Sequence, residues 1–289
     1  MKLLFSEARP DYDHYIFPYA VWAFPEPGET PADLMTAGFL PSSRQLDRFY
    51  LCRQIRVCLE RYKASSENRR ILRRGELFQA DLQPRASFKW NAAHRQLCLA
   101  CAEARFGPGK MTEDKLDELF HAPLTTHVLH VRLRQDGSTI GLATLYLEGT
   151  RLGFYSYGFY DLNWRTHQLG MFMMTYAVDS LARSGVRHLH LGTCYTTKAW
   201  YKTQFAGVEF FNGFRWSDNL EELRHLLARD QRPVLTEHLL ESPEYRQAFN
   251  IPNPADLACR WGMCTSLPTD PAAQRALVRS QVPRIDAPC

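Results

Sequence analysis

The stretch from His127 to Tyr160 constrains the fold most, because apolar and polar residues alternate along it. A period of two is typical of strands that bury one face. The pairs Asp136-Gly137 and Glu148-Gly149 interrupt the alternation, and pairs of this kind favour tight hairpin turns. We therefore expect three antiparallel strands here.

A helix and a further strand follow this meander. Residues 165–184 have helical apolar spacing and stop at Gly185, and VRHLHLGT is then typical of a strand. The strands on either side of such a crossover helix should be parallel neighbours. This layout is that of the acetyltransferase-type (GNAT) fold. We expect an α+β protein with a GNAT-like carboxyl-terminal domain and a small α+β amino-terminal domain.

Composition shifts divide the chain into three expected parts. Residues 1–85 form a basic amino-terminal domain that ends near Pro84. Residues 86–230 form the GNAT-like transferase domain, with two helices before residue 120 and a short amphipathic helix near its end. Residues 231–289 form a carboxyl-terminal helix and a Pro-rich tail.

Apolar runs and cysteines indicate the compartment. The run from Leu169 to Val178 is too short to cross a bilayer, and the amino terminus does not look like a secretory signal. We expect a soluble, cytoplasmic protein without a membrane partner. Eight scattered cysteines then favour reduced thiols, and Cys98 and Cys101 suit buried core positions of a helix.

Positive charge is concentrated between Arg44 and Arg74. This segment has ten Lys or Arg and three acids, a net of +7, so the rest of a chain of net charge +4 sums to −3. Such a run is either a solvated helix face or an electrostatic footprint for a polyanion.

A ligand should bind where the two parallel strands part, beside the start of the helix. That point lies between residues 157–161 and 191–193. Asp161 could accept a proton or bind an ammonium group, or equally cap the helix. Gly170 could admit a ligand or ease packing of the helix against the sheet. No hydrolase or P-loop motif is present, and we interpret His188 and His190 as structural.

The stretches YSYGFYDLNWRTHQLG and HLGTCYTTKAWYKTQFAGVEFFNGFRW resemble the carboxyl-terminal half of the arginyl- and leucyl-tRNA-protein transferases. The amino-terminal half matches more loosely, through Gly38, Phe39 and Ser42 and through SSENRRILRRGELFQADL. The matching positions of the carboxyl-terminal half are Tyr157, Phe159, Tyr160, Asp161, Leu169, Gly170, Leu191, Gly192, Lys198, Tyr201, Lys202, Phe205, Glu209, Gly213 and Trp216.

The resemblance implies an aminoacyltransferase of the N-end rule type. It would move an arginyl or leucyl group from aminoacyl-tRNA to the amino terminus of a protein or to a related amine. The implied catalytic candidates are Asp161, Tyr157 and Glu209, with cleft backbone at Gly158, Gly170 and Gly192. The implied tRNA contacts are Lys198, Trp200, Tyr201, Lys202, Arg69, Arg70, Arg73 and Arg74.

Two departures from the family pattern carry expectations of their own. Leu162 stands where the family has proline, and the family's cysteine set is reduced to Cys52 and Cys58. Two thiolates cannot hold an iron-sulfur cluster, so we expect no cluster, no metal and no other cofactor. The family match favours a strand over residues 57–64, whereas the spacing of these cysteines also suits a helix.

Two other functions stay open at this point. A coenzyme-A-dependent N-acetyltransferase would share the sheet and use acetyl-coenzyme A, but it would leave the basic segment without a role. A non-catalytic RNA-binding relative is the other alternative.

Overall fold

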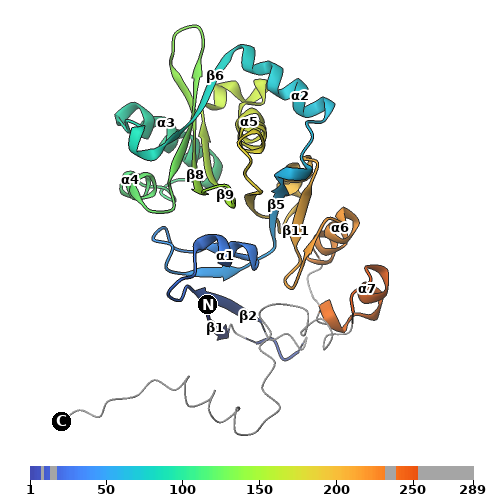
Figure 1. The fold of residues 1–289 in the computed structure, drawn as a ribbon. Helices are drawn as coiled ribbons and strands as arrows, with labels where there is room; N and C mark the ends of the chain where they lie inside the picture. The colour runs from blue at the N-terminus through green and yellow to red at the C-terminus, as the bar shows by residue number, and fades with distance from the viewer. Residues whose placement is uncertain (8–9, 14–17, 232–238, 253–289) are drawn as a thin grey trace, which may run out of the picture. The chain divides into compact units, whose positions relative to one another are not determined.

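The computed structural model describes residues 1–7, 10–13, 18–231 and 239–252 (Figure 1). The chain divides into two compact units, residues 1–237 and 238–289. In the second unit the described helix is α7 (Pro243–Ala248), which is capped by the Ser242 hydroxyl. The expected Pro-rich tail lies outside the described residues. No helix in the described part of the chain is long and apolar enough to span a bilayer.

The first unit contains an eight-stranded sheet in which the expected meander and crossover are present. The strands β7, β8 and β9 pair antiparallel, and β10 lies parallel to β9 after the crossover helix α5 (Leu169–Arg183). The α+β expectation is confirmed. The order across the sheet is β12 (Trp216–Ser217), β11 (Val208–Phe211), β5 (Gln54–Cys58), β10 (His188–Thr193), β9 (Leu152–Tyr160), β8 (Thr139–Glu148), β7 (His127–Leu133) and β6 (Phe78–Pro84).

Strand β5 corrects two expectations about the early chain. It ends at Cys58, where the 3-10 turn η1 (Leu59–Arg61) begins, so the strand expected over residues 57–64 lies earlier and the helical alternative is wrong. Because β5 pairs with both β10 and β11, and β6 pairs with β7, residues before 85 supply two strands of the large sheet. The expected boundary at Pro84 therefore does not separate two sheets.

Helices cover both faces of this sheet (Figure 1). Leu142 packs into a core cluster with α3 (Ala92–Phe106) and α4 (Glu113–His121), which includes the buried thiols Cys98 and Cys101, as expected. The adjacent residue, Gly141, faces Met173 of α5. Successive residues of a strand point to opposite faces. Helix α5 and the α3–α4 pair are therefore on opposite sides of the sheet.

The remaining elements of the first unit flank this core. The small sheet has the order β1 (Lys2–Glu7), β2 (Tyr19–Phe24), β4 (Phe49–Leu51) and β3 (Phe39–Pro41), and α1 (Pro31–Thr36) precedes β3. Helix α2 (Ser66–Arg73) contacts α5, and α6 (Leu220–Arg229) follows β12 as expected.

Candidate active site

The parallel strands β9 and β10 separate before either of them ends. Their pairing runs from His188 opposite Leu152 to His190 opposite Phe154 and goes no further. Beyond that point β10 turns through Gly192, whose φ of +84° lies in the region that favours glycine. The gap opens at the carboxyl ends of the strands, which is where the sequence predicted a ligand site.

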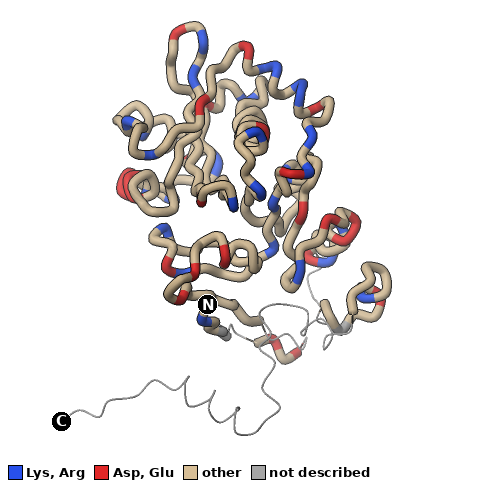
Figure 2. The backbone as a smooth tube through the Cα atoms, viewed as in Figure 1, with Lys and Arg blue, Asp and Glu red and all other residues tan. Residues whose placement is uncertain are grey.

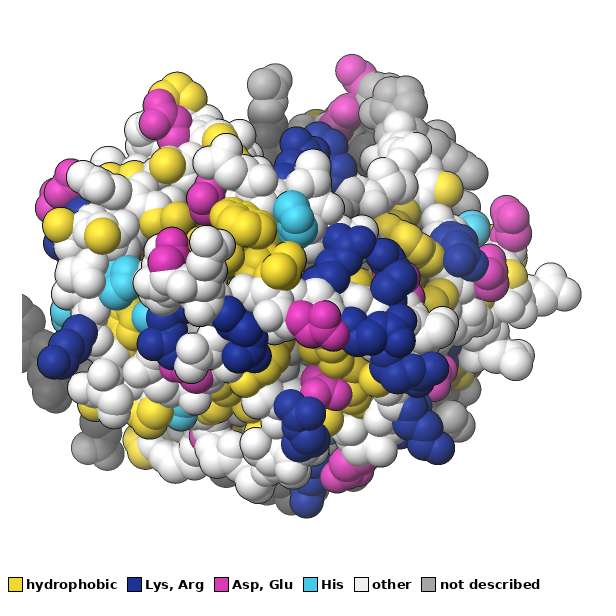
Figure 3. Space-filling model, turned by 90° about the horizontal axis from the view of Figure 1, so that it is seen from above, with side chains coloured by type: hydrophobic (Ala, Val, Ile, Leu, Met, Phe, Trp, Pro, Cys, Tyr) yellow, Lys and Arg dark blue, Asp and Glu magenta, His cyan; other side chains and the backbone are white. Residues whose placement is uncertain are grey.

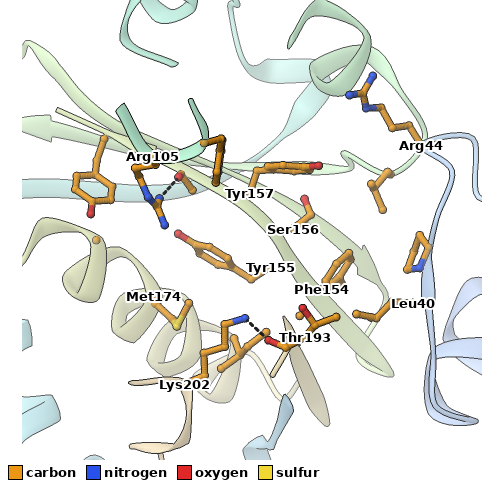
Figure 4. Close-up of a pocket in the computed structure, with 18 of the residues that line it drawn as sticks. Leu40, Arg44, Arg105, Phe154, Tyr155, Ser156, Tyr157, Met174, Thr193 and Lys202 are labelled. Atoms are coloured by element: carbon orange, nitrogen blue, oxygen red, sulfur yellow. Dashed lines mark hydrogen bonds between the residues drawn. The ribbon is translucent and has the colours of Figure 1, made fainter. Parts of the chain in front are cut away.

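A cavity of about 980 Å³ occupies this gap (Figure 4). Its walls come from β9, β10, the start of α5, the end of α3, the turn η5 (Thr197–Thr203) and the β3–β4 segment of the small sheet. Its size suits the end of a substantial ligand. Its polar and charged lining residues are Ser42, Ser43, Arg44, Arg48, Tyr50, Arg105, Glu118, Tyr155, Ser156, Tyr157, Tyr160, Arg165, Gln168, Thr193, Tyr201 and Lys202.

Strand β9 has a bulge inside the cavity. Thr144 pairs with Tyr157 and Leu145 pairs with Tyr155, so Ser156 is an extra residue between them. The Ser156 hydroxyl donates to the carbonyl oxygen of Thr144 at 2.9 Å and fixes the bulge. A bulge releases backbone from the ladder. The bulge thus frees backbone of β9 from the β8–β9 ladder at Ser156, two residues before Gly158, where the sequence predicted cleft backbone. The carbonyl oxygen of Gly158 accepts a hydrogen bond from Arg105 at 3.1 Å.

The lining is strongly cationic. Arg44, Arg48, Arg105, Arg165 and Lys202 contribute five positive groups, against the single carboxylate of Glu118, with which Arg44 forms an ion pair. Cations gathered in a concave site concentrate positive potential there. An anionic ligand, or one whose reaction develops negative charge, is favoured in this cavity.

Lys202 is half-buried and Tyr155 is buried, and both belong to the lining of the cavity. The Lys202 ammonium donates to the carbonyl oxygen of Thr193 at 2.9 Å, and burial lowers the pKa of Lys202. Burial raises the pKa of Tyr155, whose hydroxyl lies against the backbone of Gly158. Figure 4 shows both side chains turned into the cavity from its two walls.

Gly170 has a packing role at the start of α5. A Cβ added there would lie 2.8 Å from Cε1 of Tyr160. The absent side chain thus makes room for an aromatic ring of β9, which favours the packing alternative for this glycine. The preceding turn positions Gln168 in the left-handed region, with φ of 55°.

The structure gathers some of the predicted site residues in the cavity and places others outside it. Those that line it are Tyr157, Gly158, Gly170, Gly192, Tyr201 and Lys202. Asp161 caps the turn η4 (Leu162–His167) by accepting from the amide of Asn163 at 3.0 Å. Glu209 forms ion pairs with Arg56 and Arg61. Lys198 is exposed, and the ring of Trp200 lies under Arg224.

Basic residues of α2 and of its C-cap contact the rim of the cavity. Arg70 donates to the side chain of Gln168 at 3.4 Å, and Arg74 donates to the carbonyl of Thr166 at 3.4 Å. Figure 2 shows Lys and Arg following one another along α2, and Figure 3 shows basic side chains gathered over the same part of the upper face. The arginines of α2 and its C-cap form what we call the basic face of α2: Arg69, Arg70, Arg73 and Arg74. Because Gln168 and the nearby Arg165 line the cavity, this basic face and the cavity are continuous.

Sequence reasoning missed several lining residues. Arg105 reaches the cavity from the end of α3, and nothing in its local pattern distinguishes it from a solvated helix residue. Arg44 and Arg48 lie in the basic segment, but that they line the cavity depends on how the small sheet packs. Ser156 could have been found only from the register of the β8–β9 hairpin.

Cys52 and Cys58, the two cysteines that remain of the family's set, are free thiols in this fold. Cys52 is buried before β5, and burial raises its pKa to about 12. Cys58 ends the same strand, and both are free. No group of three or more His, Cys, Asp or Glu side chains in the described ranges is arranged to hold a metal ion. The absence of a cluster stays a prediction.

The split sheet, with its cavity between parallel strands, has the architecture of an acyl-transferring enzyme. A family model described as an acetyltransferase (GNAT) domain matches residues 59–203, half of the chain. The chain therefore belongs to the acetyltransferase (GNAT) domain family, and the predicted fold class is confirmed.

One curated protein supports the narrower resemblance. An aspartate/glutamate leucyltransferase from Ruegeria pomeroyi is 24% identical over 191 residues, which cover 62% of this chain and 68% of that protein. The predicted resemblance to aminoacyl-tRNA-protein transferases is confirmed. Together with the GNAT domain, this relative supports an acyl- or aminoacyl-transferase.

Solved structures match more distantly. The C-terminal domain of a putative lysylphosphatidylglycerol synthetase from Agrobacterium fabrum is 14% identical with a TM-score of 0.38, covering 50% of this chain and 46% of that one. FemX is 10% identical with a TM-score of 0.37, and the match covers 49% of this chain and 52% of that one. The chain spans about half the length of these structures.

Proposed function

We propose that this protein transfers an aminoacyl group, of the leucyl or arginyl class, from aminoacyl-tRNA to the amino group of a protein amino terminus. The observation that carries the proposal is the continuity between the basic face of α2 and the cavity between β9 and β10. An RNA acceptor end could follow the arginines to the rim and insert its charged terminus between the strands. The expected location is the cytoplasm, where aminoacyl-tRNA is made.

The chemistry requires little acid-base machinery. An aminoacyl ester is already activated, and an α-amine has a pKa near 8, so part of it is neutral at physiological pH. The protein mainly has to position both reactants. We propose that Tyr157 orients the ester and that released backbone of β9 near Ser156 and Gly158 polarises its carbonyl. Asp161 and Glu209 lie outside the cavity lining, which gives them less support than Tyr157.

We infer from the start of α5 that coenzyme A is not the acyl donor. A pyrophosphate would need the amides of this turn to be open to it. Here the ring of Tyr160 packs against Gly170. Two residues earlier, the left-handed position is occupied by Gln168, whose side chain contacts Arg70. The proposed acyl donor is therefore aminoacyl-tRNA.

The test supplies the protein with each candidate acyl donor in parallel reactions. Purified protein is incubated with tRNA pools charged with labelled leucine or arginine, and with peptides that differ only in their first residue. We expect label to move to a subset of the peptides and to be lost when the peptide amine is acetylated. A parallel reaction contains labelled acetyl-coenzyme A and the same peptides.

Two results would contradict the proposal. Acetyl transfer without aminoacyl transfer would identify an acetyltransferase. Salt-sensitive tRNA binding without transfer from any charged pool would identify a non-catalytic RNA-binding relative.

A further inference from the structure

Lys202 is a cation inside the cavity, and its role is distinct from that of the surface arginines. It extends from η5 to the end of β10, where its ammonium donates to the carbonyl of Thr193 at 2.9 Å. No ion pair joins it to a carboxylate within the described ranges. The neighbouring Cys194 thiol is buried, and burial raises its pKa, which favours the neutral form. The positive charge is therefore not neutralised by a fixed protein anion.

The backbone at the strand opening holds this ammonium in place. A Cβ added to Gly192 would lie 3.5 Å from Nζ, so the nitrogen rests over the bend between Gly192 and Thr193. An ammonium has three N–H donors, and Thr193 uses one. Among the residues that the structure describes, the other two have no hydrogen-bond partner in the protein, and they can serve a ligand that enters between β9 and β10 (Figure 4).

The arginines of α2 differ from Lys202 in position and in partners. Arg70 is paired with Glu67, and Arg69 donates to the carbonyl of Ala64 at 2.6 Å, both on the exposed helix. Such residues meet the phosphate backbone of a bound RNA. A cation enclosed between strands acts more strongly than one at the surface, because less water screens it. We therefore expect Lys202, and not the arginines of α2, to contact the reacting end of the ligand.

We propose, resting on the proposed function, that Lys202 is a catalytic residue that donates a hydrogen bond to the ester carbonyl oxygen as negative charge develops on it. The bond from the amine nitrogen to the acyl carbon forms, and the bond from that carbon to the ribose oxygen breaks. The proton that the amine loses ends on the departing ribose oxygen. Lys202 remains an ammonium throughout and is not consumed.

Single-turnover kinetics separate this role from phosphate binding. Lys202→Met is compared with the unmodified protein, each in saturating excess over aminoacyl-tRNA and with saturating peptide. The dissociation constant for aminoacyl-tRNA is measured by filter binding. We expect the rate constant to fall about 10²- to 10³-fold, the loss typical of one oxyanion donor. The dissociation constant should change much less.

A matched control is available on α4. Lys115 is exposed, and its ammonium also donates to a backbone carbonyl, that of Lys110 at 3.1 Å. Lys115→Met should leave both constants unchanged. If Lys202→Met does not fold, as judged by circular dichroism, Lys202→Gln replaces it, because the amide keeps a donor for Thr193.

The outcomes separate the two proposals. Transfer by the unmodified protein with an undiminished rate constant in the Lys202 variant, or with weakened tRNA binding alone, overturns this inference and leaves the proposed function standing. No transfer from any charged tRNA by the unmodified protein overturns the proposed function, and the inference with it.

Discussion

The Nε of Arg56 lies 2.7 Å from a carboxylate oxygen of Glu209, which directly faces it across the β5–β11 pair. The same guanidinium stacks on Trp216 at 3.7 Å from the ring centroid. Burial lowers the pKa of Arg56, and the charge of Glu209 opposes this. Glu209 thus neutralises a buried cation where the early chain joins the sheet.

Glu209→Gln should therefore destabilise the fold, because it leaves the Arg56 charge buried without its partner. We expect the free energy of unfolding to fall by about 2–4 kcal/mol in urea denaturation. Glu60→Gln is the matched control, since Glu60 and its partner Arg187 are both 69% exposed. It should change stability by less than about 0.5 kcal/mol. Equal stability of the two variants would contradict the structural role of Glu209.

Gly38→Ala should also be destabilising, because an added Cβ would enter the ring of Phe211 in the buried core. The φ of Gly38, +101°, also lies in the left-handed region that favours glycine. We expect a loss of about 2–4 kcal/mol from overpacking and left-handed strain together. Gly28→Ala shares the positive φ but meets open space, so it should cost only about 1 kcal/mol. Urea unfolding of both variants measures the difference.

Mild acid should weaken the fold through His130. Burial, together with the nearby charges of Arg132 and His94, lowers its pKa to about 4, although Asp81 opposes them. Its neutral ring is bonded to the Thr139 hydroxyl at 2.8 Å. The unfolded chain binds a proton at higher pH than the folded one, so the contribution of His130 is complete above about pH 6.5 and declines towards pH 4.

The variant His130→Gln isolates this contribution. Its urea midpoint should depend less on pH between 7.5 and 5 than that of the unmodified protein. The same pH dependence in both proteins would exclude His130 as its source. Because His94 also has a pKa lowered by burial, some acid sensitivity should remain in the variant.

The basic face of α2 should determine how RNA binding responds to salt. We expect Arg70→Ala combined with Arg74→Ala to weaken tRNA binding and to reduce the slope of log affinity against log salt by about 1–2. Arg187→Ala, next to the opposite end of β10, should leave the slope unchanged. Filter binding at several salt concentrations gives all three slopes. An unchanged slope in the double variant would place the RNA elsewhere.

Sequence patterns predicted the parts of the fold that local periodicity determines. The β7–β9 meander, α5 and β10 all have regular apolar spacing and clear turn residues, and each is present as expected. Helix α5, however, begins at Leu169 and not at residue 165, because the preceding residues form the turn η4. The place of β5 could not be predicted, because its partners lie far along the chain and no local pattern identifies them. Long-range packing also decides which side chains reach the cavity. Lys202 and Asp161 both matched the family, yet only Lys202 lines it.

The position of β5 between β10 and β11 also constrains how the protein can be made. The ribosome releases this strand long before either neighbour has been synthesised, so the large sheet cannot close until translation has passed residue 211. A gene fragment that begins after β5 would code for a sheet split in two. The part of the chain after β5 is therefore not a self-sufficient module, and exchanging it between relatives should succeed only when β5 is exchanged with it.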